Sequence, residues 1–144
     1  MKFISNSLAE TKKCATEFLD DISKTSRGTA TVIGLYGNLG SGKTTFVQCV
    51  AEILGVRERV TSPTFVILKR YTLHANRYTR LFHVDAYRLK SGEELAKLGW
   101  QELSAGQNSL IFIEWPEHVK EILPADHMEV HFEFINETTR AIEF

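Results

Sequence analysis

The sequence is poor in cysteine and proline, with two Cys and three Pro among its 144 residues. Both thiols, Cys14 and Cys49, fall in segments with helical periodicity, and no C-x-x-C pair is present. Two such cysteines do not build a disulfide framework. This sparse use of cysteine is typical of proteins from a reducing compartment, so we expect a cytoplasmic protein.

Long apolar runs and a surplus of one charge are also missing. No apolar run approaches the length needed to span a bilayer, and polar residues interrupt the segment 1–6 too early for a signal peptide. The net charge of −1 gives no global basic surplus of the kind that nucleic-acid-binding proteins usually carry. Local basic pairs such as Lys69-Arg70 are interpreted as part of a solvated surface. We therefore expect no membrane association.

The overall composition is that of an ordinary globular domain. Hydrophobic residues make up 43% of the chain and charged residues 24%, both close to average. The length fits one domain with a core of useful size, and no repeat, low-complexity segment or linker divides it. We expect residues 1–144 to form a single domain.

Helical and strand-like segments alternate along the chain. Ser7 and Glu10 have the spacing of a capping box ahead of an amphipathic helix over residues 8–23. Ser91 and Glu94 form a second such box before a short helix that Gly99 ends. The remaining predicted elements are strands at 30–36 and 110–114, a helix after the glycine-rich turn with its apolar face over 46–54, a hairpin of 65–73 with 78–84, and an alternating strand at 128–134 that can pair with 140–144. This pattern indicates an α/β protein.

The segment Gly37-Asn38-Leu39-Gly40-Ser41-Gly42-Lys43-Thr44 matches the phosphate-binding loop G-x-x-x-x-G-K-[ST] in full. Glycines let consecutive amide groups turn toward phosphate oxygens, and the helix that follows presents its N-terminus to the anion. In such a loop the lysine binds the β and γ phosphates and the threonine hydroxyl is a Mg²⁺ ligand. By chance the pattern occurs in roughly one chain of this length in 200, and here a predicted strand precedes it. The sequence therefore predicts a site for a purine nucleoside triphosphate with Mg²⁺.

Two acidic residues at strand ends are candidates for the chemistry. Glu114 closes the apolar strand 110–113, where an acidic group that holds Mg²⁺ is expected in such proteins. Its alternative is an ordinary strand-capping glutamate. Asp85 closes the strand before it and could orient water, or it could simply cap the turn ahead of Tyr87. Trp115 could pack against the nucleotide or could be a core aromatic.

Two histidines, His127 and His131, lie four residues apart and so share one face of a strand. No cysteine or carboxylate set completes a zinc site around them, and we interpret them as surface residues.

Several further motifs, taken together with the phosphate-binding loop, resemble one family: the bacterial TsaE (YjeE) ATPases of tRNA threonylcarbamoyladenosine synthesis. The similar segments follow one another in the family's order and cover almost the whole chain. They are GNLGSGKTTF at 37–46, VTSPTF at 60–65, FHVDAYRL at 82–89, EELAKLG at 93–99, LIFIEWP at 110–116 and Leu123-Pro124. The combination of SPTF, H-x-D-x-Y-R-L and IEWP is much more specific than the loop alone.

This resemblance implies a P-loop NTPase-like three-layer α/β sandwich with a mixed, largely parallel sheet. It implies weak, Mg²⁺-dependent ATP hydrolysis, with ATP and ADP as ligands, in support of threonylcarbamoyl transfer to an anticodon-loop adenosine of tRNA. TsaD and TsaB proteins are the implied partners, and contact with tRNA would be indirect.

The resemblance also assigns roles to residues of this chain. Lys43, Asp85 and Glu114 are implied as catalytic, and Thr44 and Glu114 as the Mg²⁺ ligands. Ser62 and Thr64 match a loop near the γ-phosphate. The implied nucleotide-binding residues are Thr11, Gly37, Asn38, Leu39, Gly40, Ser41, Gly42, Lys43, Thr44, Thr45, Trp115 and Arg140.

One position departs from the family. The usual loop reads GDLGAGKT, and here Asn38 stands where the family has Asp. An amide keeps its hydrogen-bonding capacity but cannot act as a base or attract a metal strongly, so slow hydrolysis is expected.

Two other functions of P-loop proteins were weighed. A small-molecule kinase needs substrate-binding arginines and a lid; no arginine-rich lid follows Asp85, although Arg77, Arg80 and Arg88 leave some room for one. A GTP-dependent switch usually carries N-K-x-D for guanine, and this tetrad is absent from the sequence.

Overall fold

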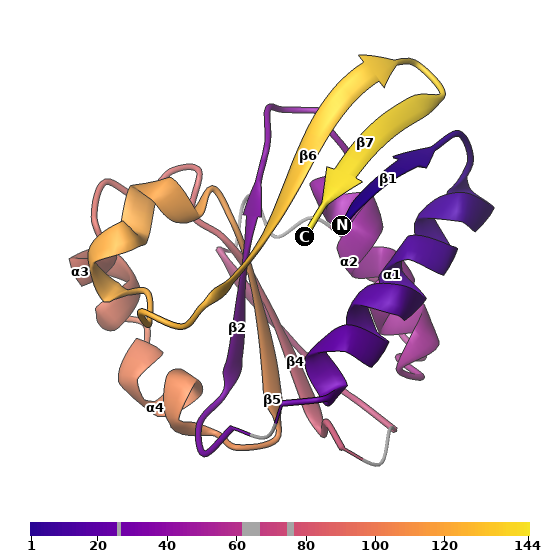
Figure 1. Cartoon of the computed structure of the whole chain (residues 1–144). Coiled ribbons are helices and arrows are strands. Elements are labelled where there is room, and N and C mark those ends of the chain that lie inside the picture. The colour runs from indigo at the N-terminus through magenta and orange to yellow at the C-terminus, as the bar shows by residue number, and fades with distance from the viewer. Residues whose placement is uncertain (26, 62–66, 75–76) are drawn as a thin grey trace.

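A mixed sheet of seven strands forms the middle layer of the molecule, as the computed structural model shows for residues 1–25, 27–61, 67–74 and 77–144 (Figure 1). The strands are β1 (Lys2–Ser5), β2 (Thr31–Tyr36), β3 (Leu68–Thr72), β4 (Arg80–Asp85), β5 (Ser109–Glu114), β6 (Met128–Asn136) and β7 (Thr139–Glu143). Their order across the sheet is β1-β7-β6-β2-β5-β4-β3. The four central strands β6, β2, β5 and β4 are parallel, and the outer pairs are antiparallel. The mixed sheet with a parallel middle is confirmed.

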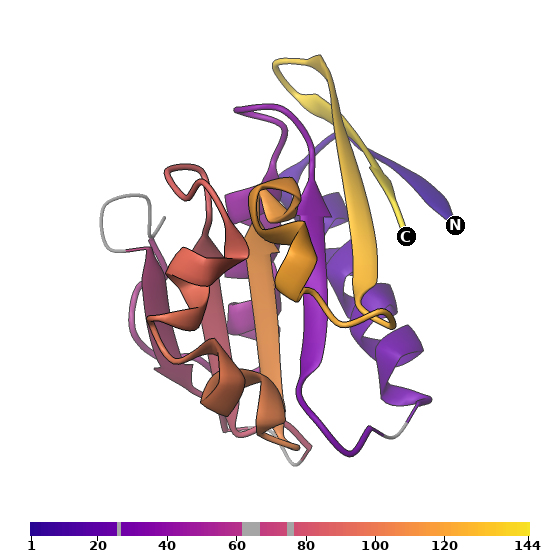
Figure 2. The ribbon, with the colours of Figure 1, turned by 90° about the vertical axis from the view of Figure 1, so that its left-hand side faces the viewer.

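Helices cover both faces of this sheet and complete the three layers. The long helices α1 (Leu8–Ser23) and α2 (Lys43–Ile53) pack side by side on one face (Figure 1). The short helices α3 (Gly92–Ala96) and α4 (Trp100–Ala105) and the 3₁₀ segment η1 (Pro116–Ile122) cover the other face (Figure 2). The predicted three-layer α/β sandwich is therefore confirmed.

The central strands are apolar on both faces because both faces are covered. Ile33 and Phe112 belong to the core cluster under α1 and α2, whereas Val32 and Ile111 belong to the cluster under the short helices. All four side chains are at most 2% exposed. A strand buried on both sides has no reason to alternate, which explains the continuous apolar runs that predicted it.

Helix starts follow the predicted signals to different degrees. The hydroxyl of Ser7 accepts a hydrogen bond from the Glu10 amide at 3.2 Å, and α1 has the predicted bounds. At α3 the Ser91 side chain makes no capping bond, although Glu94 accepts from the Lys90 amide at 2.9 Å. The capping box expected at Ser91 is therefore not formed, and α3 ends at Ala96, three residues before the Gly99 that the sequence indicated as its end.

Three elements were not predicted. Gly99, expected to end a helix, lies directly before α4 and is its N-cap, with φ = 96°. The 3₁₀ segment η1 is interrupted by a residue with non-helical backbone angles, Val119. β1 pairs with β7, more than 130 residues away, and brings the two chain ends side by side (Figures 1 and 2).

Both predicted antiparallel strand pairs are present. β3 pairs with β4, although residues 65–66 and 75–76 of this hairpin lie outside the described part of the chain. β6 pairs with β7 across a bulge between Phe134 and Asn136. Val130 and Phe132 are buried as their shared face suggests, but Phe134 near the tip is half exposed.

Within the described part of the chain, no helix combines the length and the apolar character that a membrane crossing requires.

Candidate functional site

A cavity of about 710 Å³ opens where the parallel strands end, and it gathers almost every predicted site residue. It lies between the loop before α2, the ends of β4 and β5, the start of α1 and the β6–β7 hairpin. Its lining is Ser5, Asn6, Ser7, Leu8, Thr11, Leu39, Gly40, Ser41, Gly42, Lys43, Thr44, Thr45, Asp85, Tyr87, Glu114, Trp115, Phe132, Glu137, Thr138, Arg140 and Ile142. Of the residues proposed from the sequence and described by the structure, only Gly37 and Asn38 do not line it. The carboxyl edge of the parallel strands is where ligands of open α/β sheets collect.

The loop from Gly37 to Gly42 has a shape that requires glycine at specific positions. Gly42 has φ = 104° and begins α2. A Cβ atom on Gly37 would lie 2.6 Å from Ser41 Oγ and 2.7 Å from the Phe132 carbonyl oxygen, too close for any other residue. Ser41 Oγ is buried and has no hydrogen-bond partner among the described residues. A tight turn that leaves a buried polar atom unpartnered fits a loop built to receive an anion.

Lys43, the first residue of α2, is almost fully buried at 5% exposure. Its Nζ donates to the carbonyl of Gly37 and, at 3.4 Å, to that of Asn38. The same atom lies 3.8 Å from the centroid of the Trp115 ring. Burial lowers the pKa of this lysine, and the nearby carboxylates of Glu114, Glu117 and Asp85 partly oppose that shift. Its ammonium group is thus stripped of water and held beside the loop, where an anion could reach it.

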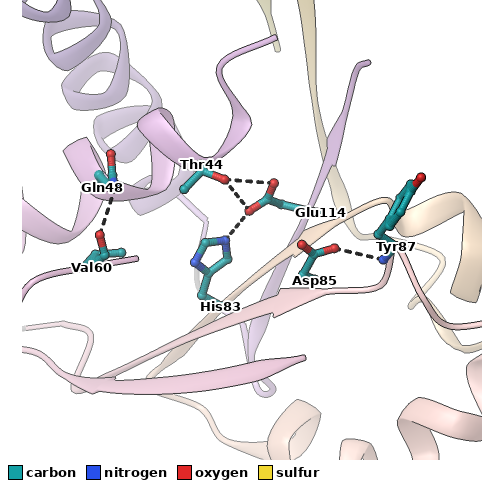
Figure 3. A network of polar contacts seen from close by, with 7 residues as sticks. All are labelled: Thr44, Gln48, Val60, His83, Asp85, Tyr87 and Glu114. Atoms are coloured by element: carbon teal, nitrogen blue, oxygen red, sulfur yellow. Dashed lines mark hydrogen bonds and ion pairs between the residues drawn. The ribbon is translucent and has the colours of Figure 1, made fainter. Parts of the chain in front are cut away.

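Thr44 and Glu114 both line the cavity, and their side chains point toward each other (Figure 3). The Thr44 hydroxyl lies 2.9 Å from Oε2 and 3.1 Å from Oε1 of Glu114, and it donates to this carboxylate. Glu114 ends β5 and is 5% exposed. A hydroxyl and a carboxylate are hard oxygen donors of the kind that Mg²⁺ prefers. The strand-end position that suggested Glu114 therefore does bring it to the threonine of the loop.

Asp85 is the register neighbour of Glu114 on the adjacent strand. Its Oδ1 accepts a hydrogen bond from the Tyr87 amide at 2.9 Å, so the turn cap weighed as an alternative is present (Figure 3). Asp85 also lines the cavity and is 5% exposed. The two interpretations therefore coexist: one carboxylate caps the turn and also faces the site.

Trp115 combines both interpretations that its position left open. It lines the cavity beside Lys43 and also packs against the core cluster under the short helices. Its backbone is left-handed at φ = 60°, a conformation that costs a non-glycine residue roughly 1–2 kcal/mol. The ring lies 5.2 Å from that of Tyr87 and 5.9 Å from that of His118. The strained backbone turns the indole from the strand end toward the loop.

Thr11 and Arg140 lie far apart in the sequence, yet both reach the cavity. The Thr11 hydroxyl bonds to that of Ser5 at 2.7 Å. The stem of Arg140 lies about 3.6 Å from where a Cβ on Gly42 would be, so this side chain crosses the loop. Its Nη1 donates to backbone carbonyls of the hairpin, whereas its buried Nε has no partner among the described residues.

Other proposed residues have a less direct place. Asn38 and Leu39 are exposed, and Asn38 contributes its carbonyl, which accepts from the Ser41 amide at 3.1 Å. Ser62 and Thr64 lie outside the described residues.

His131 is exposed, as expected, but His127 is only partly so, because its Nε2 bonds to the Tyr36 hydroxyl at 3.0 Å. The described residues contain no group of three or more His, Cys, Asp or Glu that could hold a metal ion.

The sequence assigned no role to His83, although it is the histidine of the H-x-D-x-Y-R-L segment. It is fully buried, and its Nε2 lies 2.6 Å from Glu114 Oε2 (Figure 3). The available signal was its position two residues before Asp85, because alternate residues of a strand share a face.

Comparisons with known proteins agree on one family. The family described as threonylcarbamoyl adenosine biosynthesis protein TsaE matches residues 5–142. A Rickettsia felis protein named tRNA threonylcarbamoyladenosine biosynthesis protein TsaE is 36% identical over 95% of this chain and 75% of its own length. A Bacillus subtilis protein of the same name is 36% identical over 78% of this chain and 68% of its own length. The crystal structure of Bacillus subtilis YdiB superposes with a TM-score of 0.73 at 29% identity and covers 99% of this chain and 82% of that one.

Proposed function

Because this chain belongs to the TsaE family of threonylcarbamoyl adenosine biosynthesis proteins, we propose that it binds ATP and ADP with Mg²⁺ in the cavity around residues 37–45. We further propose that it hydrolyses ATP slowly and that this hydrolysis supports the formation of threonylcarbamoyladenosine in tRNA. The family role in this biosynthesis rests on the similarity of nearly the whole chain. The nucleotide chemistry rests on the site.

The single observation that carries the nucleotide proposal is the convergence of three groups on one turn. The loop before α2 makes a tight turn that has no room for a Cβ at Gly37, the buried Lys43 donates to the carbonyl of Gly37, and Thr44 meets Glu114 beside it. Each group matches one part of a Mg²⁺–triphosphate: amide donors and a cation for the phosphates, and oxygen donors for the metal.

The residues of the chain have separable tasks in this proposal. Lys43 leaves the carbonyl of Gly37 and donates to phosphate oxygens, so its charge is matched by the ligand. Thr44 and Glu114 supply oxygen ligands to Mg²⁺, which when bound neutralises charge that develops on the phosphates. Asp85, held by the Tyr87 amide, accepts a hydrogen bond from the attacking water and orients it. Arg140 and Trp115 limit the access of bulk water to the loop.

The proposed macromolecular partners are proteins of the TsaD and TsaB type, and contact with tRNA would be indirect. This part rests on family membership and on the net charge of −1, which offers little attraction for a polyanion. A cytoplasmic location is part of the same proposal.

The arrangement of arginines gives the kinase alternative little support. Arg80 begins β4, at the end of the strand opposite Asp85 and the cavity. Arg77 donates to the carbonyls of Ser23 and Thr25 and so fastens the end of α1. Of the three arginines considered from the sequence, only Arg88 follows the strand end that faces the site.

The test is reconstitution with TsaD- and TsaB-type proteins of the same organism, tRNA and a threonylcarbamoyl donor. We expect slow ATP hydrolysis by the chain alone, faster hydrolysis with the partners, and modified tRNA only when all are present. ATP is expected to be preferred over GTP. A Lys43→Ala variant serves as the control for contaminating ATPases. Hydrolysis equal to that of this control, or phosphorylation of an added small acceptor, would contradict the proposal.

A further inference from the structure

We propose that His83 is a positioning residue that holds the Glu114 carboxylate in place for Mg²⁺ before any nucleotide binds. This inference rests on the proposed function, because it concerns the same metal. It starts from a fully buried imidazole whose Nε2 lies 2.6 Å from Glu114 Oε2.

The arrangement of the imidazole indicates which nitrogen donates. Nδ1 has no hydrogen-bond partner among the described residues, whereas Nε2 faces a carboxylate oxygen. A proton on Nε2 satisfies the carboxylate, and a proton on Nδ1 alone would leave two acceptors facing each other. His83 therefore donates through Nε2 to Glu114.

The backbone holds this donor in place. His83 lies in the middle of β4, paired with Phe112 of β5 on one side and Lys69 of β3 on the other. Its side chain has no exposed surface, so neighbouring atoms confine the ring. A donor on an interior strand is a more rigid anchor than one on a loop.

Glu114 needs such an anchor because its side chain has three rotatable torsions. Among the described residues, the other hydrogen-bond partner of this carboxylate is the Thr44 hydroxyl, which in the proposed site becomes a Mg²⁺ ligand itself. When Thr44 turns to the metal, the hydrogen bond from His83 is the one that keeps the carboxylate oriented. Outer groups of this kind typically change metal affinity or activity by about 10–100-fold.

A purely structural role is the alternative, in which His83 only fills the interior and satisfies Glu114. The two roles differ in what a substitution changes. A structural role lowers thermal stability and leaves the metal requirement unaltered. A positioning role raises the Mg²⁺ concentration needed for binding and catalysis, while nucleotide affinity without metal stays the same.

The test compares His83→Phe, which keeps a flat ring and removes the donor, with His83→Gln, whose amide nitrogen can reach the Nε2 position. Binding of ADP is titrated with Mg²⁺ and also measured in EDTA. For His83→Phe we expect the half-saturating Mg²⁺ concentration to rise about tenfold or more, with ADP affinity in EDTA changed less than about twofold. His83→Gln should recover most of this loss. His131→Phe, at an exposed histidine, should behave like the parent.

If His83→Phe does not fold, His83→Asn replaces it, because its shorter amide reaches the Nδ1 position and does not reach Glu114. A lower melting temperature with an unchanged Mg²⁺ requirement in these variants would overturn the inference and leave the proposed function intact. An ADP affinity of the parent protein that is the same with Mg²⁺ as in EDTA would instead overturn the proposed metal site, and the inference with it.

Discussion

The hydroxyl of Thr44 on α2 lies 2.9 Å and 3.1 Å from the two carboxylate oxygens of Glu114 on β5. This contact joins the first turn of the loop helix to the end of a central strand. His83 Nε2, on the neighbouring strand β4, lies 2.6 Å from Oε2 of the same carboxylate. Three elements of the fold therefore meet at one side chain, and the two residues proposed as Mg²⁺ ligands are in contact with each other.

Replacing Glu114 with alanine is expected to separate turnover from binding. Nucleotide affinity should persist in part, because the loop and Lys43 remain. Mg²⁺-dependent hydrolysis should fall by about 100-fold or more, since a loss of several kcal/mol of charge stabilisation corresponds to that factor. The measurement is steady-state hydrolysis against Mg²⁺ concentration, with nucleotide binding measured in parallel. Hydrolysis like that of the parent would show that Glu114 is not the metal ligand.

Removal of the Lys43 side chain should weaken nucleotide binding itself, before any hydrolysis. In Lys43→Ala the phosphates lose their nearest positive charge in a site shielded from water, so ATP affinity should drop by about 100-fold or more, or about 2.7 kcal/mol. Lys97→Ala, at an exposed lysine on the opposite layer, is the matched control and should keep the parental affinity. Equal affinities of the two variants for ATP would contradict the role of Lys43.

The sequence suggested that Asn38, in place of the family's usual aspartate, slows hydrolysis, but its position in the structure leads us to expect little effect on the rate. Asn38 is exposed, lies outside the cavity lining and contributes its backbone carbonyl to the loop. Asn38→Asp should therefore change kcat less than about fivefold, because an exposed charge contributes under about 1 kcal/mol. A gain of more than tenfold in single-turnover hydrolysis would instead assign this side chain a direct catalytic role.

Both cysteines are expected to be unreactive in the folded protein. Burial, followed by the charge of Glu17 and the neighbouring Cys49, raises the pKa of Cys14 from 9.0 to about 12, and burial also raises the pKa of Cys49. Because the thiolate is the nucleophile, alkylation at pH 8 should be slow without denaturant and fast in its presence. Counting modified thiols by mass spectrometry measures this, and rapid labelling of the native protein would contradict the packing of α1 against α2.

The same shifts set a direction for stability against pH. A thiol whose pKa is higher in the folded state ionises first in the unfolded chain, so ionisation stabilises the unfolded state above about pH 9. The stability associated with the neutral thiols should be fully present below pH 9 and decline as the pH rises from 9 toward 12. Free energies of unfolding taken from urea curves at several pH values measure this decline, and Cys14→Ala should reduce it. An unchanged dependence of the free energy of unfolding on pH in this variant would contradict the prediction.

Local patterns predicted most of the fold that surrounds the site. The phosphate-binding motif, the run Leu110–Ile113 before Glu114 and the helix over 8–23 each carry their signal within a few residues. β1 could not be predicted in this way, because Lys2–Ser5 has no strong hydrophobic periodicity. It is a strand because it pairs with β7. α4 and η1 are short and irregular, and packing rather than propensity determines them.

Site residues that belong to a local sequence pattern could be predicted, whereas those that depend on contacts between strands could not. Glu114 and Asp85 were identified by their position at strand ends, and the register places them side by side. The role proposed for His83 depends on the 2.6 Å contact of its Nε2 with Glu114 Oε2. This contact exists because β4 and β5 are neighbours in the sheet, and the sequence around His83 does not show that. The left-handed backbone of Trp115 is likewise set by tertiary packing.

The most direct measurement for the central claim is equilibrium dialysis of the purified chain against labelled ADP and ATP, with Mg²⁺ and with EDTA. The account predicts one nucleotide bound per chain, tighter with Mg²⁺ than without it, and no binding to Lys43→Ala at the same concentrations. No retention of either nucleotide by the folded parent chain, or equal retention by the Lys43→Ala variant, would contradict it.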